Sequence, residues 1–164
     1  MPTAVEFFLK LDKIDGESMD SKHKGEINVE SFSWGVNHAN VNGGFGSGAG
    51  AGRASFEDFS FVSRSSKASP QLMLACATGR HIATGVLTGR LTGNAAEFYT
   101  VKLTDILVSS FKDVSDSQTG NHDGFPMSHV SLSFGKILFI EQSILGDGSV
   151  SPPASFDIQR NVEG

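Results

Sequence analysis

The sequence predicts a mainly β protein: a two-sheet β-barrel or sandwich of about nine strands, with one short helix and a glycine-rich extended loop. Apolar residues recur at every second position along most of the chain, which is typical of half-buried strands. Only one segment, at about 70–78, carries both a helix start and a helix stop signal. The 164 residues are enough for a single domain, 1–164, with one core.

The first strand is predicted by four apolar residues at alternate positions: Val5, Phe7, Leu9 and Leu11. A second alternation carries Ile27 and Val29, and then shifts by one residue to Phe32 and Trp34. A one-residue phase change inside a continuous strand predicts a β-bulge. The bulge would keep all four side chains on the core face and leave Ser31 and Ser33 on the opposite face.

Residues 43–52 consist almost entirely of glycine, alanine and serine and predict a low-complexity, extended arm. A strand at about 54–62 follows. Ser69 and Pro70 then predict a helix start and Gly79 a left-handed helix end. A helix of two turns is not stable alone, so it should cover an apolar opening. Together with Phe32 and Trp34, its core residues are predicted to be Leu72, Met73 and Cys76.

The C-terminal half again predicts strands. One spans 81–91, and after a turn at 92–95 another spans 98–108, where the alternation slips between Leu103 and Ile106. Residues 113–126 are predicted to form a polar loop. Alternation resumes around 130–134, and the run 137–140 is apolar on both faces, as in a central or covered strand. A loop at 146–153 precedes a terminal strand that begins at Phe156.

Composition excludes several classes of function. The net charge of −5 and the pI of about 5.4 argue against a nucleic-acid groove, which needs clustered lysine and arginine. No run of 18 apolar residues predicts membrane insertion, and the first residues lack the features of a cleavable signal peptide. Charged residues are only 19% of the chain and phenylalanine occurs 13 times. Apolar surface is therefore buried either in a large core or between chains.

The sequence predicts no catalytic, metal or cofactor site, and hence not an enzyme. The glycine run lacks the Lys-Ser/Thr of a phosphate-binding loop, since Arg53 and Ala54 follow it, so an arm is favoured over a nucleotide site. Gly-x-Ser-x-Gly is absent. Cys76 is the single cysteine, which rules out an internal disulfide and indicates a buried structural thiol.

The five histidines match no common metal-ligand spacing. His122 and His129 flank Asp123 in the predicted polar loop. His81 is expected to close the last carbonyls of the helix, whereas His23 and His38 are expected in or beside loops without partners.

Several segments resemble those of one family, in order along the chain. They are Ile14-Asp15-Gly16-Glu17-Ser18, Glu26-Ile27-Asn28-Val29, Ser33-Trp34-Gly35, Pro70-Gln71-Leu72-Met73 through His81, Leu107-Val108-Ser109-Ser110, Ser131-Leu132-Ser133-Phe134, and Phe156-Asp157-Ile158-Gln159-Arg160-Asn161. With these segments the chain resembles the haemolysin-coregulated protein (Hcp) family. The resemblance spans the chain, although 113–129 and 141–153 depart from it.

The resemblance implies a barrel that forms six-membered rings, which stack into the inner tube of a type VI secretion system. Its partners would be other copies of the chain, the sheath, spike and baseplate components, and small effectors carried in the lumen. The protein would assemble in the bacterial cytoplasm and be secreted without a signal peptide.

The resemblance places the face with Ser31 and Ser33 toward the lumen; the alternative is that they are simply solvated strand residues. The arm would contact the adjoining ring or subunit through Gly43, Gly44, Phe45, Gly46, Ser47 and Gly48. Two other functions remain open: a tail-tube subunit of another phage-like particle, and a monomeric β-sandwich that binds a ligand. A secreted effector enzyme is disfavoured.

Overall fold

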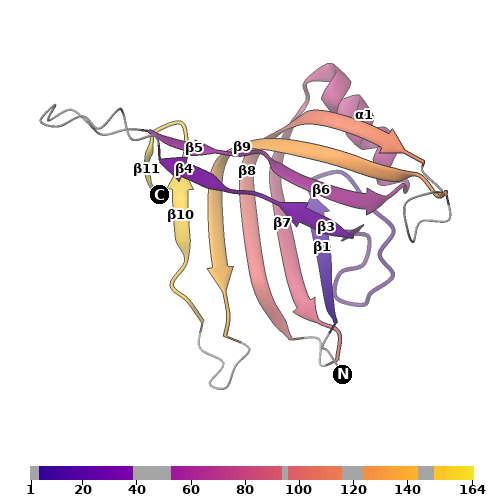
Figure 1. Cartoon of the computed structure of the whole chain (residues 1–164), viewed down its shortest axis with the longest axis horizontal. Helices are drawn as coiled ribbons and strands as arrows, with labels where there is room; N and C mark the ends of the chain where they lie inside the picture. Colours follow the sequence, from indigo (N-terminus) through magenta and orange to yellow (C-terminus); the bar gives the residue numbers. More distant parts are fainter. Residues whose placement is uncertain (1–3, 39–52, 94–95, 116–123, 144–149) are drawn as a thin grey trace, which may run out of the picture.

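The computed structural model describes residues 4–38, 53–93, 96–115, 124–143 and 150–164. These residues form eleven strands and one helix (Figure 1). In chain order they are β1 (Val5–Leu11), β2 (Ile27–Val29), β3 (Ser31–Ser33), β4 (Val36–His38), β5 (Ala54–Phe56), β6 (Phe59–Arg64), α1 (Ala68–Thr78), β7 (His81–Leu91), β8 (Glu97–Val114), β9 (Met127–Glu141), β10 (Ala154–Asp157) and β11 (Val162–Glu163). The predicted mainly β class with one short helix is confirmed.

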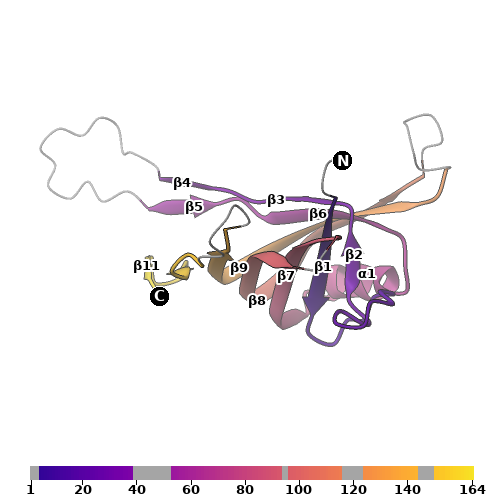
Figure 2. The same ribbon diagram turned by 90° about the horizontal axis from the view of Figure 1, so that it is seen from below.

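Two layers of strands enclose the core, and they share the long strands β8 and β9. The four-strand layer has the order β3-β6-β9-β8 and uses the first part of β9 and the last part of β8. The seven-strand layer has the order β2-β1-β7-β8-β9-β10-β11 and uses the remaining parts of β8 and β9. In Figure 2 the strands β3 and β6 lie above β1 and β7, with α1 on the same side of β6 as the core. No helix in the described ranges is both long enough and apolar enough to cross a membrane.

Local irregularities in β8 allow it to serve both layers. Asp105 has a φ of 63°, in the left-handed region, which interrupts the alternation of side chains along the strand. Leu103 and Ile106, which have opposite parity, are therefore both buried. This is the position of the slip in alternation that the sequence contains. The register with β9 shifts between Val108 and Ser110, where the strand passes into the four-strand layer.

The predicted bulge near Ser31 is wrong. β2 pairs with β1 and β3 pairs with β6, so the two segments are separate strands joined by a bend at Glu30. The chain crosses there from one layer to the other, and the Glu30 amide donates to the carbonyl of Val62. Both layers turn their apolar faces to one core, which explains why the apolar parity changes at the crossing.

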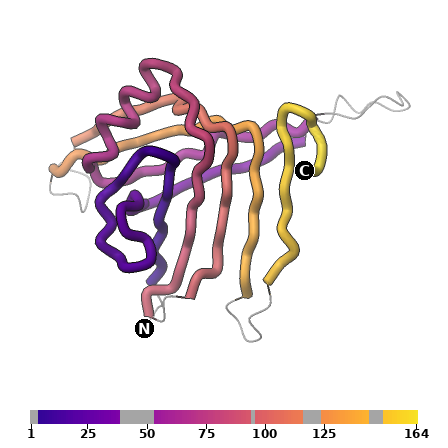
Figure 3. The backbone as a smooth tube through the Cα atoms, turned by 180° about the vertical axis from the view of Figure 1, so that it is seen from behind, coloured from indigo at the N-terminus to yellow at the C-terminus, as the bar shows by residue number. Residues whose placement is uncertain are grey.

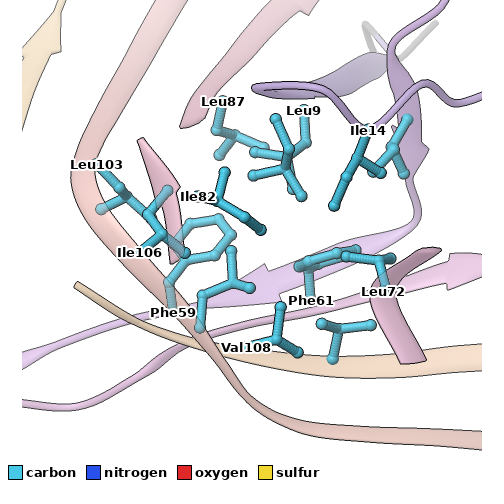
Figure 4. Packing of buried hydrophobic residues seen from close by; sticks show 14 of the residues in the cluster. Leu9, Ile14, Phe59, Phe61, Leu72, Ile82, Leu87, Leu103, Ile106 and Val108 are labelled. Carbon is cyan, nitrogen blue, oxygen red and sulfur yellow. The ribbon is translucent and has the colours of Figure 1, made fainter. Parts of the chain in front are cut away.

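The core lies between the layers and is closed on one side by α1 (Figure 4). Its largest fully buried side chains come from both layers and from the helix, and they include Leu9, Phe59, Phe61, Leu72, Leu103 and Ile106. Phe32, Trp34 and Cys76, three of the predicted core residues, are half-buried and pack against this cluster.

The helix begins about two residues earlier than predicted, at Ala68, and ends as predicted at Gly79, which has a φ of 69°. Its buried residues are Ala68, Ser69, Leu72 and Ala75. The prediction that Met73 is a core residue is wrong, because its side chain is 49% exposed. Successive helical residues are rotated by about 100°, so Met73 faces away from the stripe that carries Leu72.

The segment between β1 and β2 covers the outer face of β1 and β7, where Figure 3 shows it as an indigo loop. Arg90 of β7 fixes it through two hydrogen bonds to the carboxylate of Asp20, of 2.6 and 3.0 Å. Arg90 also donates a hydrogen bond of 2.9 Å to Glu6 of β1. The hydrogen bond from Arg90 holds the pKa of Asp20 at about 2, below its usual 3.8.

His23 belongs to the same cluster, and the prediction that it has no partner is wrong. Its ring stacks on Phe8 at 4.5 Å and contacts Glu26 at 3.0 Å and Glu97 at 3.2 Å. A buried imidazole must satisfy its nitrogens, and the two carboxylates do so. The expectation for His81 is also wrong: it lies 3.5 Å from Asp105 on the surface, and the amides of Gly79 and Arg80 donate to the helix carbonyl of Ala75.

Candidate functional site

The outer face of the four-strand layer carries a continuous row of serines. Strand pairing places Ser33 of β3 opposite Ser60 of β6, Ser60 opposite Ser131 of β9, and Ser131 opposite Ser110 of β8. The hydroxyls of Ser60 and Ser131 are 3.0 Å apart and hydrogen-bonded. These four residues, here called the serine row, run across the strands from one edge of the layer to the other.

A second row lies beside the serine row on the same face. It consists of Ser31, Val62, His129 and Lys112, again directly paired across the four strands. The two rows line a depression of about 400 Å³. Its lining contains hydroxyls, one imidazole, one ammonium group and the apolar residues Phe32, Phe61, Val62 and Val130, and no carboxylate, so the surface is of mixed polarity and slightly basic.

The residues between the two rows fix the direction of the serines. Phe32, Phe61 and Val130 alternate with them and point into the core, because successive side chains of a strand point to opposite faces. Phe32 stacks on Phe59 at 5.7 Å and meets Phe7 edge-on at 4.8 Å. A one-residue slip of β3 would therefore expose this aromatic cluster.

The structure places Ser31 and Ser33 as exposed residues on this face. The sequence did not point to Ser60, Ser110 and Ser131. Ser60 and Ser131 have the opposite parity to their buried neighbours, whereas Ser110 has the same parity as the buried Val108 and reaches the outer face through the register shift between them. His129 was assigned to a polar loop and this is wrong, since it lies in β9. The expected loop at 113–126 is also shorter, because β8 continues to Val114.

A two-stranded arm extends from the four-strand layer. β4 and β5 pair only with each other among the described strands, and they continue the line of β3 and β6 away from the body (Figure 2). The Glu57 amide donates to the carbonyl of Gly35 at 2.9 Å and closes the base of the arm. The predicted contact residues Gly43, Gly44, Phe45, Gly46, Ser47 and Gly48 lie outside the described residues.

An apolar groove of about 260 Å³ runs beneath the arm, on the side away from the serine row. The arm contributes Val36 and Phe56, the residue Trp34 lies between β3 and the arm, and β9 and β10 contribute Ile137, Phe139, Ala154, Ser155 and Phe156. Trp34 meets Phe139 edge-on at 5.3 Å, and its indole nitrogen donates to the hydroxyl of Tyr99 at 2.9 Å. Burial raises the pKa of the Tyr99 hydroxyl above its usual 10.0.

Neither surface has the geometry of a catalytic centre. The serine row has no nucleophile aligned with a general base, and the groove is lined by carbon. Within the described ranges, no three histidine, cysteine or acidic side chains gather closely enough to hold a metal ion.

Comparison with known proteins shows which family this chain matches. Residues 8–139 match the family model described as "Type VI secretion system effector, Hcp". The chain is 35% identical over 165 residues to protein hcp1 of Pseudomonas aeruginosa, covering 98% of this chain and 99% of that protein.

Solved structures agree with the family match. The crystal structure of Hcp1 from Salmonella typhimurium superposes with a TM-score of 0.80 at 32% identity, covering 98% of this chain and 99% of that one. The structure of a type six secretion system protein superposes with a TM-score of 0.85 at 25% identity, covering 98% and 100% of the two chains.

Proposed function

Because the chain belongs to the Hcp family, the secreted tube proteins of type VI secretion systems, we propose that it closes into a six-membered ring whose bore is lined by the serine face. Rings stacked on one another would then form the inner tube, in contact with sheath, spike and baseplate components. Assembly would take place in the cytoplasm before export from the cell.

The observation that carries the proposal is the pair of edges of the four-strand layer. At one end of the layer, β3 pairs with β6 and with no other described strand. At the other end, residues 110–114 of β8 pair with β9, and the pairing with β7 stops at Leu107. Edge strands carry free backbone donors and acceptors that can extend a sheet into another chain.

These two edges differ in sequence and lie at opposite ends of the layer, so a contact between them is head to tail. A head-to-tail contact forms a ring when its rotation closes. Repetition of the contact would continue the serine row from Ser110 of one subunit to Ser33 of the next. The bore would then carry a closed belt of hydroxyl groups.

A hydroxyl-lined bore suits transport of small effectors. Serine side chains are short and uncharged, and they exchange hydrogen bonds with water and with cargo at little net cost. Lys112 and His129 beside the row add a weak preference for acidic surfaces. We propose that the bore holds effectors loosely, so that they can be released after export.

Negative-stain microscopy and native mass measurement test the ring. Annular particles with a hollow centre and a mass near six times 17.4 kDa are expected. A uniform monomer at all concentrations would contradict the proposal and favour a monomeric binding domain. A tail-tube subunit of another phage-like particle would give the same particles, and the neighbouring genes would then distinguish the two systems.

A further inference from the structure

The outer face of α1 has the composition of a buried helix. The eleven residues Ala68–Thr78 include no charged side chain. Met73 and Leu74 are each 49% exposed, and their exposed neighbours on the helix are Pro70, Gln71, Ala77 and Thr78. A surface helix normally turns charged and polar residues to solvent, and a helix that is apolar on all sides is normally covered. The outer face of α1 therefore lacks its partner within one subunit.

The groove beneath the arm is an apolar surface of the opposite shape. It is concave, and its walls and floor carry no charged residue. Val36, at its rim, is 51% exposed. In Figures 1 and 2 the arm and α1 lie at opposite ends of the molecule, so the helix of a subunit does not reach its own groove.

Both surfaces lie next to the edges that the ring contact would bring together. α1 packs against β8 beside its free edge, on the core side of the four-strand layer. The groove starts at Trp34, directly after β3, and Trp34 faces the same core side. When the edge of β8 from one subunit lies beside β3 of the next, the helix and the groove meet on the side away from the bore.

We propose that α1 of each subunit seats Met73 and Leu74 in the apolar groove beneath the arm of the next subunit. This inference rests on the proposed ring and names its second contact. Backbone pairing at the edges sets the register, while the helix in the groove supplies the apolar burial that strand pairing alone lacks.

A charge-exchange experiment tests the contact. Leu74→Lys and Val36→Glu are made singly and together, at positions exposed enough in one subunit for each variant to fold, which circular dichroism checks. Met19→Lys is the matched control, since Met19 is 88% exposed and lies in the segment between β1 and β2. Ring mass is measured over a dilution series by light scattering.

Each single variant is expected to weaken ring association at least tenfold, because a charge would be buried in an apolar contact. The double variant should regain most of this loss, because the two new charges attract, and Met19→Lys should assemble like the wild type. If Leu74→Lys assembles like the wild type, or if the double variant loses as much association as the two single variants together, the helix contact is refuted. Rings formed by the wild type would in that case still support the proposed ring. A wild type that stays monomeric would overturn both.

Discussion

A methyl group added at Gly16 would test how the segment between β1 and β2 is held. The α-carbon of Gly16 lies against the backbone of the chain just before β2. A β-carbon there would lie 2.5 Å from the carbonyl oxygen of Glu26 and 2.7 Å from the α-carbon of Ile27. Both atoms belong to the backbone, so no side chain can move aside to relieve the contact.

The cost of Gly16→Ala follows from this distance. Ordinary contact with a β-carbon starts near 3.4 Å, so the backbone at Gly16 must move away from the backbone at Glu26 and Ile27 by almost 1 Å. That movement strains the hydrogen bonds from the Gly16 amide to the Gly25 carbonyl, at 2.7 Å, and from the Ser18 amide to the Glu26 carbonyl, at 3.0 Å. Overpacking costs about 1–3 kcal/mol and a weakened hydrogen bond about 1 kcal/mol, so we expect a loss of about 3 kcal/mol.

Urea unfolding followed by the fluorescence of Trp34, the single tryptophan, measures this loss. The matched control is Gly93→Ala, since a β-carbon at Gly93 has no neighbour within 4 Å. Its free energy of unfolding should change by less than about 0.5 kcal/mol. In thermal unfolding, the melting temperature of Gly16→Ala should fall by roughly 6–12 °C. All variants must be compared at one protein concentration, because association adds stability. Equal midpoints for Gly16→Ala and Gly93→Ala would refute the reasoning.

Three further predictions concern single residues. Arg90 lowers the pKa of Asp20 from 3.8 to about 2, so the resulting stabilisation is complete above pH 3.8 and is lost as the pH falls through 2. In a plot of the urea midpoint against pH, Asp20→Asn should therefore flatten the fall between pH 3.8 and 2. Tyr99 is the single tyrosine, and the ultraviolet absorbance of its phenolate should titrate above pH 10.0 in the folded protein and shift down on unfolding in urea; equal midpoints would contradict its burial. Ser33→Arg should leave rings intact in the microscope and lower the amount of effector that co-purifies with them; unchanged cargo would show that this face does not hold it.

The strand periodicity was the most reliable guide in the sequence to which face of a strand each residue occupies. It predicts the parity of Phe32 against Ser31 and Ser33, and it marks the slip between Leu103 and Ile106. Both follow from one local rule, that successive side chains of a strand point to opposite faces. The cause of each shift is not local. The shift near Asp105 is caused by a residue in the left-handed conformation, and the shift near Glu30 by the crossing of the chain between layers. Both causes leave the same trace in the sequence, a one-residue change in the parity of the apolar positions.

The serine row could not be predicted from any one strand. Ser60 and Ser131 have the expected parity and Ser110 follows a register shift after Val108, and only the pairing register shows that the three form one row with Ser33. Register depends on contacts between residues far apart in the chain, and a single sequence does not contain it. His23 illustrates the same limit, because its partner Glu97 is 74 residues away.

The wrong prediction for Met73 is the one that bears most directly on function. Its apolar side chain was assigned to the core, because a sequence shows that a residue is apolar and not which chain will cover it. The structure of one subunit leaves Met73 and Leu74 exposed on an uncharged helix. Exposed apolar surface of this kind is unusual unless another molecule binds it. The low charge of the chain left burial in a core and burial between chains equally open, and the proposed contact of α1 with the next subunit would account for part of it by the second.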